Sequence, residues 1–149
     1  MRMIKTITVA LASLTIVMTL AGATAAAAAT SKTVVYGFGN HQVGWAHPEV
    51  RPTRATFGLA GEDGIKRIRW HDWRRSSASG QGLHELFTGT GVKDQKATIN
   101  LARVRTHKGQ RYFSHLVMRW TTKNGKHHTE TLNWGYDKGV GWLWLGNFQ

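Results

Sequence analysis

The sequence predicts an all-β fold, in the form of a single small antiparallel β-sandwich or barrel-like domain that follows a signal peptide. Two observations predict the strands. Apolar and polar residues alternate along several segments rich in Thr, Val, Ile and Trp, as they do in a strand with one buried face. Turn sequences that contain Gly separate these segments, and no stretch keeps the three-and-four spacing of a helix for long.

The first pair of expected strands forms a hairpin. Residues 53–59 and 65–73 have the composition of strands, and a Gly-Glu-Asp-Gly sequence at 61–64 separates them. Two Gly-rich stretches follow the hairpin. We expect a loop or bulged strand at 76–82 and a second loop at 88–94.

The clearest pattern is a three-stranded antiparallel meander over residues 96–134. Its central strand, 111–121, has two candidate inward faces. The face that carries Leu116, Met118 and Trp120 stays apolar to the end of the strand. We therefore expect these three side chains in the core.

A tight turn is expected before the last strand of the meander. Asn124 and Gly125 form the pair that a type I′ turn favours, because both central positions of that turn need a positive φ.

A signal peptide explains the N-terminal sequence. Arg2 and Lys5 precede a largely apolar run at 7–20, and small residues with Ala-x-Ala cleavage triplets follow that run. We expect a signal peptide at 1–29 and one β-rich domain at 30–149. The alternative, an uncleaved anchor, fits less well because the second half of the stretch is Ala and Thr. The processed chain is expected to be extracellular or associated with the cell envelope, with no integral membrane segment.

The processed chain is strongly basic and has no cysteine. It keeps 18 of the 20 Lys and Arg residues and all 8 Asp and Glu residues, which leaves a net charge of +10. A polyanion such as a cell-wall polymer or nucleic acid suits this charge as a partner, although solubility alone also explains it. The lack of cysteine excludes thiol catalysis and Cys-ligated zinc. We expect a monomer that uses no cofactor.

Two groups of residues are candidates for ligand binding. Four arginines lie close together in sequence around the second expected strand, where they can contact anions. Two tryptophans lie two residues apart in the Gly-rich tail, so they share one face of an extended segment, and we expect them to be exposed. The candidates are Arg67, Arg69, Arg74, Arg75, Trp142 and Trp144.

Candidates for catalysis are weaker. His71 and Asp72, with His84 and Glu85 downstream, have the residue types of a general acid and base pair. No motif fixes their geometry, and a solvated strand face explains them better. The chain has 8 histidines, but adjacent His127 and His128 point to opposite faces of a strand, so we expect no metal site.

The sequence therefore favours a non-enzymatic binding or interaction module for anionic envelope or extracellular polymers. The alternative is a small secreted hydrolase that acts on phosphodiesters, as a nuclease does. A cleft that holds histidine and carboxylate together would favour the hydrolase, and a basic face without such a cleft would favour binding.

Several short motifs resemble a known family. They are Arg51-Pro52, the W-x-x-W pair Trp70 and Trp73, Ala78-x-Gly80-x-Gly82, and Arg111-Tyr112-Phe113. With these motifs the chain resembles an actinobacterial family of small secreted proteins of unknown function. The resemblance implies a secreted location and a β-rich fold and implies nothing about chemistry. Members typically carry two cysteines after the Gly-x-Gly motif, and residues 86–96 of this chain contain none.

Overall fold

The computed structural model describes residues 32–39, 43–57, 63–88 and 91–146. The expected signal peptide at 1–29 lies outside the described residues. Over these four ranges, no helix is long and apolar enough to cross a membrane.

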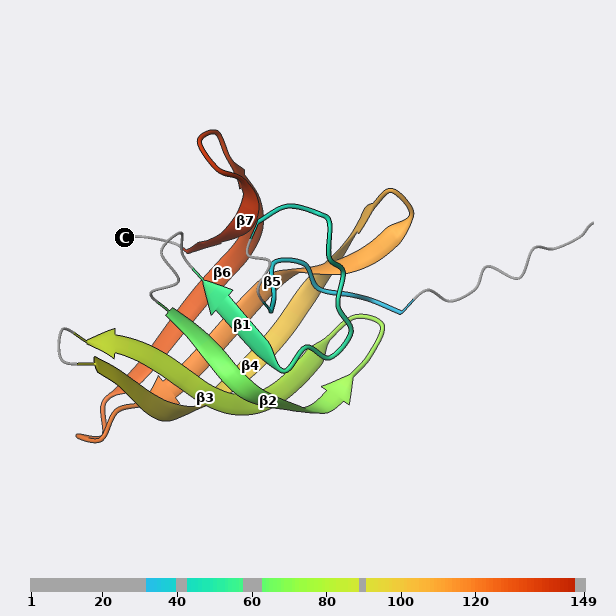
Figure 1. Ribbon diagram of the computed structural model, residues 1–149. Helices are drawn as coiled ribbons and strands as arrows, with labels where there is room; N and C mark the ends of the chain where they lie inside the picture. The colour runs from blue at the N-terminus through green and yellow to red at the C-terminus, as the bar shows by residue number, and fades with distance from the viewer. Residues whose placement is uncertain (1–31, 40–42, 58–62, 89–90, 147–149) are drawn as a thin grey trace, which may run out of the picture.

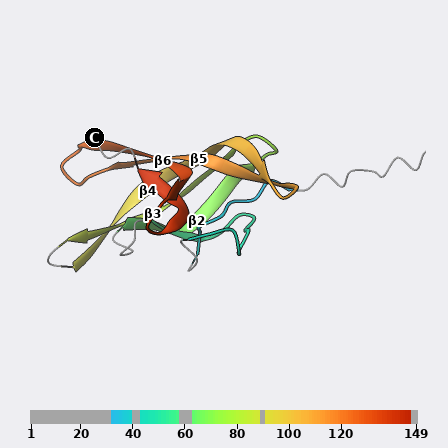
Figure 2. The ribbon, with the colours of Figure 1, turned by 90° about the horizontal axis from the view of Figure 1, so that it is seen from above.

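Seven strands form one antiparallel sheet in which each strand pairs with the next along the chain. The strands are β1 (Arg54–Phe57), β2 (Asp63–Trp73), β3 (Ala78–Thr88), β4 (Gly91–His107), β5 (Gln110–Thr121), β6 (His127–Asp137) and β7 (Gly141–Gly146). The sheet curls until β1 lies across β5 and β6 (Figure 1), and seen from above β5 and β6 lie over β2 and β3 (Figure 2). The prediction of an all-β, barrel-like domain is confirmed.

The expected pairings are present. β1 and β2 form the first hairpin, with Ala55 opposite Ile65, and β4, β5 and β6 form the meander. The prediction of a loop at 88–94 is wrong, because β4 already begins at Gly91. The stretch at 76–82 is mostly strand, since β3 begins at Ala78. Gly82 lets β3 approach β2 closely, because a Cβ there would lie 2.7 Å from the Lys66 carbonyl oxygen.

The turn at Asn124-Gly125 exists but is not type I′. Only Gly125 has a positive φ, of 81°, and its N–H donates to the Thr122 carbonyl at 2.9 Å. This is the three-residue hairpin loop that ends in a left-handed glycine. The β4–β5 turn is the one in which both central residues, Lys108 and Gly109, have positive φ, of 46° and 79°.

The central strand of the meander has the expected inward face. Leu116 and Met118 are fully buried, and Trp120 is partly buried against the core. The other face is also covered near the start of β5, where Phe113 is fully buried. There the Phe113 ring packs edge-on against the Trp73 ring, with centroids 5.5 Å apart. The segment 33–38 lies beside the start of β5, because the Val34 N–H donates to the Arg111 carbonyl at 3.0 Å and the Phe113 N–H donates to the Val34 carbonyl at 2.9 Å.

The same N-terminal segment joins distant strands of the barrel. The Gly39 N–H donates to the Arg54 carbonyl at 2.9 Å, which ties the segment to β1. The Trp144 indole donates to the Tyr36 carbonyl at 2.8 Å, which ties it to β7. Side chains from this segment, including Phe38, contribute to the core.

The barrel has two ends that differ in content. We call the end at which β2, β4 and β6 begin the polar end, and the end at which β3, β5 and β7 begin the aromatic end. In Figure 1 the polar end faces left. At the aromatic end, Trp45 contacts the rings of Tyr36, Tyr112 and Trp142, with centroids about 5 Å apart in each case.

Candidate functional site

A row of polar side chains crosses the outer face of five strands. The residues are Cα partners in series from β2 to β6, and they are Arg69, Gln81, Thr98, Arg119 and Thr129. Successive side chains of a strand point to opposite faces of the sheet. The residues next to these five along each strand point into the core, so these five side chains point outward. The row therefore presents hydrogen-bonding groups, with one cation on β2 and one on β5.

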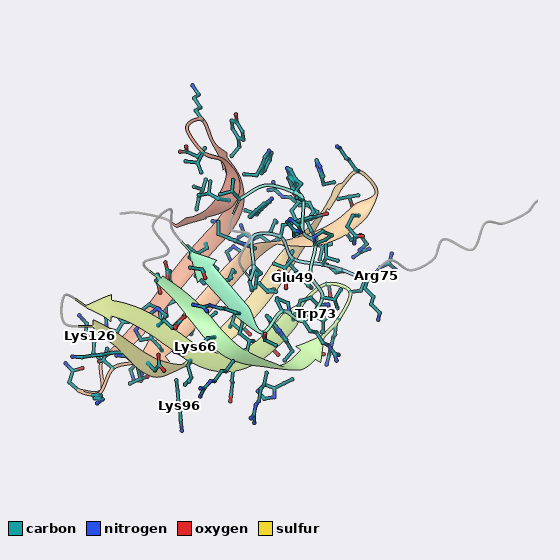
Figure 3. The ribbon with its side chains drawn as sticks, viewed as in Figure 1. Glu49, Lys66, Trp73, Arg75, Lys96 and Lys126 are labelled. Carbon is teal, nitrogen blue, oxygen red and sulfur yellow. The ribbon has the colours of Figure 1, made fainter. Side chains whose placement is uncertain are left out.

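Four exposed cations make up what we call the basic face, namely Arg67, Arg69, Lys96 and Arg119. Lys96 projects away from the outer side of the sheet in Figure 3. Within the described ranges none of the four forms an ion pair, whereas Lys66 nearby is paired with Glu85 and Asp94, both at 3.0 Å. The four charges are therefore available to an external anion.

Two shallow grooves run over the basic face. One, of about 490 Å³, is lined by Arg67, Arg69 and Lys96. The other, of about 360 Å³, is lined by Lys96, Arg119 and His127. Lys96 and Thr98 line both grooves, so the two form one continuous track across the strands.

A bulge in β2 places Arg67 beside this track. The pairing of β2 with β3 shifts between Lys66 and Arg69, and Arg67 has a φ of 52°. A non-glycine residue in this left-handed region is uncommon, and bulges re-aim side chains. The bulge brings Arg67 to the same groove as Arg69.

The structure separates the four candidate arginines into two pairs. Arg67 and Arg69 belong to the basic face, but Arg74 and Arg75 lie beyond the end of β2, at the aromatic end. The Arg74 Nε atom lies 2.7 Å from the Asp72 carboxylate. The four arginines therefore do not form one binding surface.

The two candidate tryptophans also differ from each other. Trp142 is partly buried, and its ring centroid lies 5.9 Å from that of the exposed Tyr136. Trp144 is only 4% exposed, so the expectation that it is an exposed ligand-binding residue is wrong. The reason is that the tail forms β7 against β6 and turns Trp144 into the core, where it contacts Phe38 and Trp134.

The three catalytic candidates do not form one site, because His71 and Asp72 are adjacent in β2 and Glu85 is distant from both. His71 is exposed on β2, and Asp72 is paired with Arg74. Glu85 instead bonds to Arg54 at 3.2 Å, and its Cα partner is Gly64 at the other end of β2. At about 3.3 Å per residue, Glu85 is roughly 25 Å from Asp72, so they do not form an acid and base pair.

A different set of titratable groups meets inside the polar end. Asp63 on β2, His84 on β3 and Glu130 on β6 offer ligand atoms that all lie within 4.8 Å of one another. We call these three residues the polar cluster. His84 is fully buried, and its Nε2 atom is hydrogen-bonded to Asp63 Oδ1. The Trp120 ring covers the His84 ring, with a centroid distance of 4.1 Å.

Burial has an electrostatic effect on the polar cluster. It raises the pKa of Glu130 to about 7, and the nearby Asp63 carboxylate adds to this rise. The cause is that an ionised carboxylate loses solvation inside the protein and repels its neighbour. Glu130 thus holds its proton far more readily than an exposed glutamate does.

Sequence reasoning missed the polar cluster, although a signal for it exists. Asp63 comes two residues before the buried Ile65, and Glu130 two residues before the buried Leu132. Strand alternation therefore turns both carboxylates inward. That they meet at one end of the barrel depends on the pairing of all seven strands, which the sequence pattern did not reveal.

Comparison with known proteins identified no relative of this chain. No protein-family model matches the chain, and no curated protein or solved structure matches it either. The resemblance to a secreted actinobacterial family therefore stays a prediction, and arguments about function depend on the geometry.

Proposed function

We propose that this protein is a secreted, non-enzymatic module that binds anionic polymers of the cell envelope or extracellular space through its basic face. The observation that carries the proposal is the continuous track formed by the two grooves. Four cations line it, and no carboxylate belongs to the described lining of either groove. A surface of one charge sign attracts the repeated charges of a polyanion.

The spacing of the cations favours a polymer over a small anion. Arg69 and Arg119 are separated by the two strands that carry Gln81 and Thr98. Three strand spacings of about 4.8 Å put their backbones about 14 Å apart. One small anion cannot contact both, whereas an extended chain of anionic groups can, with Gln81 and Thr98 as hydrogen-bonding partners between them.

The phosphodiesterase alternative lacks a suitable site on the track. His127 and His128 line the second groove, but no carboxylate is among the residues described there to orient or assist them. The polar cluster does combine histidine with carboxylates, yet His84 has no exposed surface and cannot touch a substrate. This arrangement favours binding without hydrolysis.

The test compares two double variants that lose the same charge. Binding of a labelled single-stranded oligonucleotide and of heparin is titrated at several salt concentrations. For Arg69→Gln with Arg119→Gln, we expect weaker binding and a fall of about 1.4 in the slope of log K against log salt for the oligonucleotide, because two phosphate contacts are lost. Arg74→Gln with Arg75→Gln is the matched control and should keep the parental slope.

Two outcomes count against the proposal. An equal loss in both double variants shows that net charge, and not the basic face, attracts the polymer. Cleavage of the oligonucleotide by the purified protein supports the hydrolase alternative. Secretion is tested separately by N-terminal sequencing of exported protein, which should begin between Ala26 and Ser31, and a mature protein that retains Met1 contradicts it.

A further inference from the structure

We propose that Asp63, His84 and Glu130 bind one divalent cation, for which Zn²⁺ is the best match, inside the polar end of the barrel. The inference is independent of the basic face and concerns the opposite, inward side of the same strands. It depends on three observations, which are the geometry of the donors, the polar atoms around them that lack partners, and the balance of charge.

The donor geometry is close to that of a metal site. One imidazole nitrogen and two carboxylate oxygens converge from three strands, with all three atoms within 4.8 Å of one another. Ligands of a tetrahedral zinc ion lie about 2.1 Å from the metal and hence about 3.4 Å apart. A small side-chain movement reaches that spacing, and Asp63, whose side chain is 31% exposed, gives a path for the ion.

Buried polar atoms without hydrogen-bond partners gather at this end. Over the part of the chain that the structure describes there are six such side-chain atoms, and four belong to the polar cluster or to residues next to it. They are His84 Nδ1, Glu130 Oε2, Trp120 Nε1 and Gln95 Oε1. Gln95 is the Cα partner of His84, and Trp120 packs on its ring. Buried polar atoms normally have partners. The Glu130 and Gln95 oxygens are acceptors that a cation or its bound water would satisfy, whereas the Trp120 Nε1–H group is a donor and gives no support for a cation.

The charge balance points to a cation. Asp63 and Glu130 are neighbouring carboxylates. In the described structure Asp63 is paired with His84, and neither carboxylate forms an ion pair with Lys or Arg. By contrast, Glu85, the chain neighbour of His84 on the outer face, contacts two cations. A buried charge is normally paired or coordinates a metal. One divalent ion would neutralise both carboxylates.

The donor set selects the type of metal. One imidazole with two carboxylates suits Zn²⁺, whereas Ca²⁺ and Mg²⁺ prefer sites made of oxygen ligands alone. Three protein ligands also leave a fourth tetrahedral position free for water or a ligand.

The experiment measures Zn²⁺ binding to the purified protein after EDTA treatment and removal of the chelator. Isothermal titration calorimetry should give one tight site. With free Zn²⁺ at 100 times Kd, the melting temperature should rise by about 10 °C. In Asp63→Asn and Glu130→Gln, which keep the shape of each side chain, affinity should fall by about 100-fold, and at the same Zn²⁺ concentration the melting temperature should rise by only about 2 °C.

Two control variants keep the proposal open to contradiction. Glu85→Gln removes a carboxylate next to His84 on the outer face, and His127→Gln removes an exposed histidine able to bind metal. Both should keep the parental affinity. In NMR spectra of the parent, the imidazole ¹⁵N signals of His84 should shift on addition of Zn²⁺. Absence of binding in the parent, undiminished binding in Asp63→Asn and Glu130→Gln, or loss only in His127→Gln would each overturn the proposal.

Discussion

The two ends of the barrel are built from the same strands but are filled in different ways. At the aromatic end, Trp45 packs among aromatic rings, and the indole of Trp144 donates to a backbone carbonyl. At the polar end, a histidine and two carboxylates meet, and several buried polar atoms have no partner. The first arrangement buries a large apolar area, which stabilises the fold, although two buried side-chain atoms at this end, Trp134 Nε1 and Arg111 Nε, also lack a partner among the described residues.

The second arrangement is hard to explain by stability. Burial of polar groups without partners costs free energy, and an apolar pair would fill the same space at lower cost. Sites that bind ligands often carry such a cost, since the groups that bind are unsatisfied when the ligand is absent. The comparison therefore indicates that the aromatic end stabilises the fold, whereas the polar end is arranged for binding a ligand at a cost in stability.

The largest expected effect is at the aromatic end. Trp144→Ala should lower the free energy of unfolding by about 3–5 kcal/mol, because it removes a buried indole and leaves a cavity. Trp120→Ala at the polar end should cost clearly less, since Trp120 is partly exposed and its Nε1 has no partner. Urea unfolding of both variants tests this order. A greater loss for Trp120→Ala would contradict the division of roles.

The next prediction tests which face of β5, the strand that runs between the two ends, points into the core. Leu116→Ala should cost about 2–5 kcal/mol, because Leu116 is fully buried in the middle of β5. Arg119→Ala should change stability by no more than about 0.5 kcal/mol, because that side chain is exposed on the outer face. Thermal and urea unfolding measure both. If Arg119→Ala is the more costly change, the inward face of β5 is misassigned.

The inward face of β5 is also the part of the fold that the sequence predicts best. Buried and more exposed residues alternate from Ser114 to the end of β5, so the inward face that carries Leu116 and Met118 could be identified without a structure. Prediction failed where glycine patterns were ambiguous. Gly91 was expected in a loop and lies in β4, and the Gly-rich tail was expected to expose Trp144. In both cases pairing with a neighbouring strand overrides the local preference of glycine for loops.

The candidate sites show where sequence reasoning ends. Arg67 and Arg69 could be proposed for the basic face, because closely spaced cations on one strand are visible in the sequence. Their partners Lys96 and Arg119 lie on other strands and become neighbours only through the sheet register. The polar cluster depends even more on register, since its residues come from β2, β3 and β6. Short-range periodicity contains no information about such distant pairings.

The third effect tests the cost of the polar end. In EDTA at pH 8, Glu130→Gln should raise the free energy of unfolding by about 1 kcal/mol, a figure that allows for the exposed part of the side chain. Burial raises the pKa of Glu130 from 4.5 to about 7. The parent therefore has the full stability of the protonated side chain below pH 4.5 and loses it as the pH rises through 7, where the buried carboxyl group must ionise. The advantage of Gln should therefore grow with pH.

Urea unfolding at pH 4 and pH 8 provides the measurement, with Glu85→Gln as the control. Glu85 is buried and paired with Arg54 and Lys66, so its replacement should destabilise the protein at pH 8, which is the opposite sign to Glu130→Gln. A Glu130→Gln variant that is less stable than the parent at pH 8 would show that the polar end stabilises the metal-free fold.

The smallest effect compares two hairpin turns at opposite ends. Lys108 in the β4–β5 turn has a φ of 46° and precedes Gly109, whereas Lys123 in the β5–β6 turn is not among the residues with positive φ. A positive φ costs lysine about 1 kcal/mol, and Asn tolerates it better. Lys108→Asn should therefore stabilise the protein by about 0.5–1 kcal/mol, while Lys123→Asn, with the same loss of charge, should change stability by less. Thermal melts of the two variants at one salt concentration compare them directly, and equal shifts would mean that charge, and not backbone conformation, is responsible.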